Sequence, residues 1–228
     1  MDGYPGVYSG FEQMKKTIFA LAMAGTMMPA AAFAQDSYDD QEGDYISGAE
    51  NKSGVRIEGR VLYERLDDPV LDEGVTYEFG NGIGFGVEAG YDFPVGETIT
   101  AGPYFTYDFS SLETCEDNAC FAAPEYWAAG LQVGFATGES GLLYGKLGYG
   151  QQTVTLQGTI DDPFDPFAPP LVFDERETKG GYNFAFGYEH GFGETIYARG
   201  EFGVSESYDI YGFDLQRGLF ALSLGARF

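Results

Sequence analysis

Residues 83–93 read IGFGVEAGYDF, and in this stretch apolar side chains alternate with glycine or an acid. Neighbouring side chains of a strand point to opposite faces, so one face would carry Ile83, Phe85 and Val87. The other face would carry glycines and Glu88. The same period of two returns along the chain, with no sustained helical spacing, at residues 55–64, 99–109, 127–135, 143–150, 182–189, 196–204 and 220–228. The sequence therefore predicts eight strands.

The composition excludes several classes of protein. Among 228 residues there are 36 Asp and Glu against 12 Lys and Arg, a formal net charge of -24. No basic surface is available to neutralise phosphates, so nucleic acid is not an expected partner. Hydrophobic residues make up 44% of the chain, which is too apolar for a disordered protein. Glycine is frequent, at 34 residues, without the period of collagen.

Residues 14–34, MKKTIFALAMAGTMMPAAAFA, have the layout of a secretory signal peptide. Lys15 and Lys16 form its positive start, and an apolar stretch follows. Ala32 and Ala34 form a small-x-small cleavage site. We therefore expect an exported protein whose signal peptide is removed.

The rest of the chain divides at the ends of this signal. Residues 1–13 fit no region of a signal peptide and leave the start of translation open between Met1 and Met14. Residues 35–53 are polar and acidic, which predicts a flexible lead-in. Residues 54–228 hold all the alternating stretches and form the expected domain.

The connections between the strands decide which kind of barrel is expected. Alternation alone fits a soluble barrel with apolar residues inside or a membrane barrel with apolar residues outside. Here the connections alternate between short ones, near residues 93–97, 137–140 and 191–194, and long ones, at residues 67–81, 110–125, 158–178 and 205–215. Short periplasmic turns with long extracellular loops are typical of outer-membrane barrels.

The two strand faces agree with this interpretation. Glycine on the polar face suits the narrow interior of eight strands, where there is little room for side chains. Aromatic side chains on the apolar face lie near strand ends, as two interfacial girdles would: Tyr63, Phe93, Phe109, Trp127, Tyr149, Tyr188 and Phe228. We predict an all-β fold, an eight-stranded antiparallel up-and-down transmembrane β-barrel.

With these strands in place, the chain resembles the small OmpA-like outer-membrane barrels, in particular the opacity-type surface antigens of the "porin family". The resemblance covers residues 54–228 and rests on VRIEGRVLYERL (55–66), IYARGEF (196–202) and LFALSLGARF (219–228). It implies the outer membrane of a Gram-negative cell. Proteins of this group end in an aromatic residue that the assembly machinery reads, and the residues that match this signal are Leu222, Leu224, Ala226 and Phe228. None of these motifs is a catalytic signature.

Charged residues gather on the face that would line the lumen. Unpaired charges would be costly in a narrow interior, so we expect ion pairs and hydrogen bonds among them. A plug that holds the barrel shut is the favoured interpretation, because eight strands leave only side-chain room, and an ion path is the alternative. The expected network comprises Arg56, Glu58, Arg60, Glu64, Glu88, Lys146, Glu189, Arg199 and Glu201, with Asp92, Asp108 and Arg227 on the same face.

Cys115 and Cys120 lie in the second long connection, in the sequence CEDNAC. Two cysteines of an exported protein are expected to be oxidised. A metal site would need further ligands. We therefore predict a disulfide that clamps this loop.

Catalytic and cofactor sites are not expected. His190 is the single histidine and lies beside a predicted periplasmic turn, far from the outer rim where a lipid-modifying barrel enzyme would need it. One histidine also makes a weak metal site. The acidic loop at 158–178 lacks the spacing of a calcium loop, so a solvated loop is the default interpretation.

We expect an integral outer-membrane barrel with a structural and surface-interaction role, like an adhesin or antigen, and no enzymatic activity. A narrow porin-like channel is the alternative, and a lipid-modifying enzyme is third. The expected partners are outer-membrane lipid and lipopolysaccharide, the barrel-assembly machinery, and an extracellular ligand bound by the acidic loops. A monomer is expected.

Overall fold

The computed structural model describes residues 48–70, 75–116, 118–160 and 170–228. The predicted signal peptide (14–34) with Ala32 and Ala34, the extension 1–13 and most of the lead-in lie outside these residues. The strands are β1 (Gly54–Val70), β2 (Val75–Pro94), β3 (Ile99–Ser110), β4 (Glu113–Glu116), β5 (Ala119–Thr137), β6 (Gly141–Ile160), β7 (Leu171–Phe192), β8 (Ile196–Ile210) and β9 (Phe213–Arg227). Within the described residues, no helix has the length and apolar character needed to cross a bilayer.

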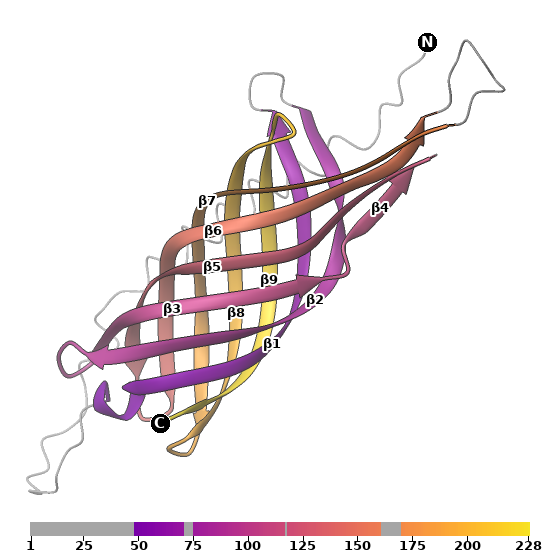
Figure 1. Cartoon of the computed structure of the whole chain (residues 1–228). Coiled ribbons are helices and arrows are strands. Elements are labelled where there is room, and N and C mark those ends of the chain that lie inside the picture. Colours follow the sequence, from indigo (N-terminus) through magenta and orange to yellow (C-terminus); the bar gives the residue numbers. More distant parts are fainter. Residues whose placement is uncertain (1–47, 71–74, 117, 161–169) are drawn as a thin grey trace, which may run out of the picture. The chain divides into compact units, whose positions relative to one another are not determined.

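Eight of these strands form a closed antiparallel ring. Each pairs with the next in the chain, β3 pairs with β5, and β9 pairs with β1 to close the ring. The short β4 pairs with β5 alone. In Figure 1 the C-terminus and the short turns lie at one end of the ring, and β4 lies at the other. The predicted all-β, up-and-down, eight-stranded fold is confirmed.

The two faces of the ring are apolar outside and polar inside. Ile83 and Phe85 each keep 65% of their surface exposed, although they are large apolar residues. Glu88, in phase with the glycines of the same strand, is 1% exposed. This is the reverse of a soluble barrel and the arrangement of a membrane barrel.

The long connections differ from the prediction. We expected loops at 67–81, 110–125, 158–178 and 205–215, but the strands continue through much of these stretches. The β1–β2 pairing runs to Val70 and Val75, and the β6–β7 pairing runs to Ile160 and Leu171. A backbone hydrogen-bond ladder does not need alternating apolar residues once the strands leave the bilayer, so the sequence pattern ends before the strands do.

The end of the expected lead-in also differs from the prediction. Residues Glu50–Lys52 form a 3-10 helix, η3, at the end of the ring that carries the short turns. The backbone N–H of Ala49 donates to the carbonyl of Glu97 at 3.0 Å. The Lys52 ammonium donates to the carbonyl of Ser140 at 2.8 Å, and Ala49 and Lys52 are both buried. Hydrogen bonds to two different turns hold this segment against the barrel, so residues 48–53 belong to the folded unit.

Candidate functional site

The lumen is organised around the carboxylate of Glu88 on β2. It accepts hydrogen bonds from Arg56 Nη1 at 2.6 Å, Arg60 Nη1 at 3.1 Å, Thr106 Oγ1 at 2.7 Å and Lys146 Nζ at 2.7 Å. These partners come from β1, β3 and β6, so one carboxylate ties four strands across the interior. Such a group is stabilised only because its charge is shared among several donors.

Further ion pairs extend this centre through the lumen. Lys146 also pairs with Glu201 on β8, and Arg60 Nη2 lies 3.2 Å from the same carboxylate. Arg199 donates to Glu189 from both Nε and Nη2, at 2.9 and 2.7 Å. Glu189 also accepts from Arg227 Nη1 at 2.6 Å. The two halves of the barrel are therefore joined by charge-assisted hydrogen bonds through its middle.

Toward the other end of the lumen, Arg217 on β9 makes the corresponding bridge. Its Nε donates to Glu64 at 2.5 Å, and its Nη2 donates to Asp108 at 3.1 Å. Arg217 was not predicted for the lumen, because the alternating pattern of the last strand begins at Phe220. Arg217 is ten residues before Arg227, an even spacing, so both belong to one strand face.

Charges of opposite sign balance in this interior. We use the term lumen network for the buried side chains that these ion pairs join. Its acids are Glu58, Glu64, Glu88, Asp92, Asp108, Glu189 and Glu201. Its bases on strands are Arg56, Arg60, Lys146, Arg199, Arg217 and Arg227. Lys52 of η3, 3.8 Å from Glu189, adds the positive charge that makes the numbers equal. The net negative charge of the chain therefore lies outside the lumen network.

Tyrosine rings fill the space between these charges. The Arg217 guanidinium lies 4.1 Å from the Tyr126 ring centroid, and that of Arg199 lies 4.5 Å from the Tyr144 centroid. Arg227 lies 5.0 Å from the Tyr197 centroid. Stacking on aromatic faces suits the planar guanidinium, which holds it while its edge donates to carboxylates. These tyrosines were not among the residues predicted for the lumen.

Buried residues lie toward both ends of the lumen. At the end with long strand extensions, a buried apolar cluster lies inside the ring: Leu66, Leu112, Ala123, Val154, Ile210 and Leu215. At the opposite end lies η3 with Lys52. A small hollow between them, lined by Arg60, Lys146 and Glu201 among others, leaves about 10 Å³ for a water-sized molecule. That is room for about one water.

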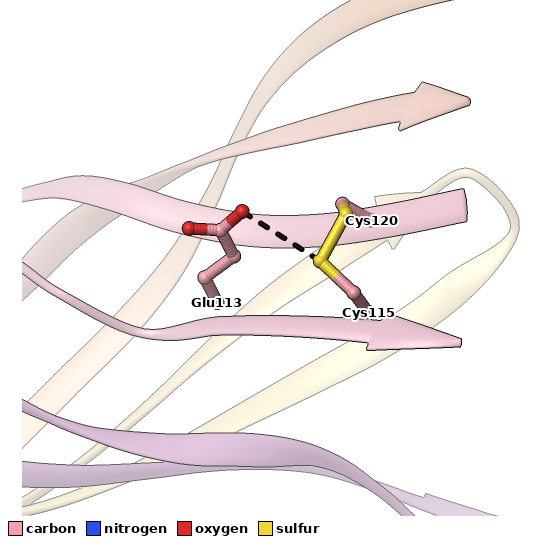
Figure 2. The surroundings of a disulfide bond; sticks show 3 residues. All are labelled: Glu113, Cys115 and Cys120. Atoms are coloured by element: carbon pink, nitrogen blue, oxygen red, sulfur yellow. Dashed lines mark hydrogen bonds between the residues drawn. A yellow bond between two sulfur atoms is a disulfide. The ribbon is translucent and has the colours of Figure 1, made fainter. Parts of the chain in front are cut away.

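The cysteines lie opposite each other in the β4–β5 hairpin. Cys115 pairs in register with Cys120, and their sulfurs form a disulfide. Figure 2 shows Glu113 beside this bond, with Oε1 3.7 Å from Cys115 Sγ. These three residues are the one group of possible metal ligands within the described ranges. Both sulfurs are in the disulfide and neither is a thiolate, so the group does not form a metal site.

The remaining predicted residues lie on the outside of the barrel. His190 is exposed on β7 and meets Phe192 edge-on, with ring centroids 5.2 Å apart. It faces outward, so it shares no pocket with the lumen network. Leu222 and Leu224 also face outward, and the backbone of Phe228 exchanges two hydrogen bonds with Val55, at 3.0 and 2.9 Å.

The strand extensions beyond the apolar band carry mainly acidic side chains. The exposed acids there include Glu78, Glu113, Glu116, Asp174, Glu175, Asp209 and Asp214. Arg65 pairs with Glu78 at 3.2 Å, and Lys179 pairs with Glu177 at 3.3 Å. Basic side chains are fewer, so this end presents a negative potential to solvent.

Comparisons with known proteins support the same architecture. A family model described as "Outer membrane protein beta-barrel domain" matches residues 17–228. No curated protein matches the sequence. The structure of Ail from Yersinia pestis, in complex with the heparin analogue sucrose octasulfate, is 18% identical and covers 77% of this chain and 99% of its own, with a TM-score of 0.52. Neisserial surface protein A is 12% identical and covers 77% of this chain and 98% of its own, with a TM-score of 0.50. At these identities the likeness shows the fold alone.

Proposed function

Because the chain belongs to the family of outer membrane protein beta-barrel domains, we propose that it is a closed, non-enzymatic outer-membrane barrel whose exposed end binds partners at the cell surface. The observation that carries this proposal is the filled lumen. The lumen network spans the interior, an apolar cluster covers one end, and η3 covers the other. A barrel that conducts solutes would need a continuous wet path, and side chains packed in these positions support a closed lumen instead.

Conductance in planar bilayers tests the closed lumen. Folded, purified protein should give no stable openings, because the lumen ion pairs would have to break for water to pass. Neutralising one partner, as in Arg199→Gln or Glu88→Gln, should at most produce short, irregular events. Stable, discrete openings of the unaltered protein that change size in these variants would support the narrow channel instead.

The acidic outer end supports the binding role. Rigid strand extensions present it beyond the bilayer, where surface loops and strand ends commonly carry recognition. The Yersinia protein was solved with a polyanion, and the negative potential here disfavours such a ligand. We therefore propose that the partners of this chain are not polyanions.

A shortened variant tests where binding occurs. Replacing the tips of the β1–β2 and β6–β7 hairpins with two-residue turns should leave the barrel folded, because the ring is paired along its whole transmembrane length. Cells carrying this variant should lose surface binding. If they bind host cells as before, the outer end is not the binding region.

A further inference from the structure

A hollow at the outer end has no role in the closed barrel described above. It is an open hollow with a volume of about 580 Å³, lined by residues of β2, β4, β5, β6 and β9. Its apolar lining includes Phe79, Phe121, Leu156 and Phe213. Hollows of this volume, lined by aromatic side chains with a few polar groups, are the usual form of a ligand site.

The aromatic side chains that line this hollow pack against one another and against the buried cluster. The ring centroids of Phe79 and Phe121 lie 4.9 Å apart, and those of Phe79 and Phe213 lie 5.6 Å apart in an edge-on arrangement. Phe79 and Phe121 also pack on the buried cluster that covers the lumen. The wall therefore rests on buried apolar residues, while Phe213 keeps 42% of its surface exposed.

The rim of the hollow is acidic. Glu78, which also pairs with Arg65, and Glu116 line it. Among the described residues that line it, none is basic. Aromatic faces also attract cations, so the rim and the wall both favour a positively charged ligand.

The disulfide fixes one side of the hollow before any ligand arrives. Thr114, Glu116 and Cys120 line it from the β4–β5 hairpin, and the Cys115–Cys120 bond joins the two strands of that hairpin. A segment that is already ordered loses less conformational entropy on binding. Such preorganisation would explain why a strand as short as β4 carries the Cys115–Cys120 disulfide.

We propose that this hollow binds an exposed polypeptide segment in which an aromatic or long aliphatic side chain stands next to Lys or Arg. The apolar side chain would enter between Phe79, Phe121 and Phe213, and the cation would lie at Glu116. This inference rests on the proposed surface-binding role and names the chemistry of its partner. Anionic lipid headgroups and polyanions are repelled by the same rim.

The binding test uses the folded full mature chain in detergent micelles or nanodiscs, titrated by calorimetry. The probe is the synthetic peptide amide Arg-Trp-Arg-Trp, compared with Arg-Gly-Arg-Gly and Glu-Trp-Glu-Trp. The first peptide should bind, and the other two should bind at least about tenfold more weakly, because each lacks one of the two contacts. Equal binding of Arg-Gly-Arg-Gly would show that charge alone drives binding and would contradict the apolar contact. Equal binding of Glu-Trp-Glu-Trp would show that the cation does not contribute and would contradict the contact with Glu116.

Paired variants locate the site. Phe213→Ser should weaken binding of Arg-Trp-Arg-Trp about tenfold, and Glu116→Gln about threefold with a smaller salt dependence. Val172→Ser and Asp174→Asn are matched controls, because both residues are exposed on β7 and do not line the hollow. Unchanged binding in Phe213→Ser, or equal losses in the controls, would overturn the proposal.

The outcomes separate this inference from the proposed function. If the peptide fails to bind while conductance stays absent and cells still adhere through the outer end, the hollow is not the site but the closed surface-binding barrel stands. Stable conductance would count against the closed barrel whatever the peptide does.

Discussion

At the scale of single residues, Glu88 carries the most concentrated set of contacts in the barrel. Replacing it by glutamine removes the charge that Arg56, Arg60 and Lys146 share. We expect Glu88→Gln to lower the free energy of unfolding by about 3 kcal/mol, because buried positive charges lose their counter-charge. Urea unfolding in detergent, followed by the fluorescence of the single tryptophan, Trp127, measures the change.

Two further variants test the reason for this loss. Glu113→Gln removes an equally negative but exposed side chain and should change stability by less than about 0.5 kcal/mol. Adding Lys146→Met to Glu88→Gln should restore part of the loss, with a coupling energy of about 1–3 kcal/mol. Independent, additive effects of the two substitutions would mean that the pair does not interact as the geometry indicates.

The sequence predicts which residues face the interior but not how they pair. Alternation places Arg56, Glu88 and Glu201 on the inner face, and the structure buries them there. Alternation cannot say which carboxylate a given arginine meets, because partners such as Arg217 and Glu64 are 153 residues apart. Lys52 lies before the first strand, so no strand period could assign it to the lumen.

At the scale of elements, η3 should tolerate the loss of the Lys52 charge but not its reversal. Burial lowers the pKa of Lys52 below its ordinary value, and the nearby Glu189 carboxylate opposes that shift. The lowered pKa means that the charged form is disfavoured in the fold, so Lys52→Met should leave the segment in place. Lys52→Glu puts a like charge beside Glu189 and should release it.

Hydrogen exchange of the Ala49 amide measures this release, since that N–H donates to Glu97 only in the latched form. We expect exchange in Lys52→Glu to be at least about tenfold faster, equivalent to about 1.4 kcal/mol of opening free energy. Asn51→Ala is the matched control, because Asn51 is exposed in the same turn. Equal exchange in Lys52→Glu and the control would show that backbone contacts alone hold η3.

The β4–β5 hairpin gives a second prediction at this scale. Replacing Cys115 and Cys120 by serine should destabilise the hairpin locally by about 2 kcal/mol, the entropy that a short closed loop removes from the open state. The ring should keep its gel mobility, because β4 pairs with β5 alone and lies outside it. Free-thiol labelling of the unreduced parent protein at either position would contradict the disulfide itself.

The extents of the strands could not be predicted as well as their order. In β1 the alternation is clear from Val55 to Tyr63, yet the strand runs to Val70. Within the bilayer the outer face of each strand must be apolar, and this requirement produces the alternation of apolar and polar residues in the sequence. Beyond the bilayer both faces can be polar, and only the pairing with β2 keeps the strand, which a single sequence does not reveal.

At the scale of the whole molecule, charge is divided between two compartments. The lumen network is neutral, while the chain carries a net charge of -24. The excess negative charge therefore lies outside the lumen network, and the acids of the described outer end, such as Glu78 and Asp174, are exposed to water, where they repel other acidic surfaces. A neutral interior and an acidic outer end are compatible in one small barrel because the buried apolar cluster separates them.

Closure of the ring depends on its last residue in two separable ways. The backbone of Phe228 exchanges hydrogen bonds with Val55 at the seam between β1 and β9, while its side chain is 75% exposed. We expect Phe228→Ala to refold in detergent like the parent, because both backbone bonds remain. In cells the same variant should assemble poorly into the outer membrane, because the aromatic end that we propose the assembly machinery reads is missing. Deleting Phe228 should impair both processes, since it removes the seam bonds as well.

Comparing the mobility of boiled and unboiled samples, from refolding reactions and from isolated outer membranes, measures both effects. Normal assembly of Phe228→Ala in cells would leave the terminal side chain with a packing role only.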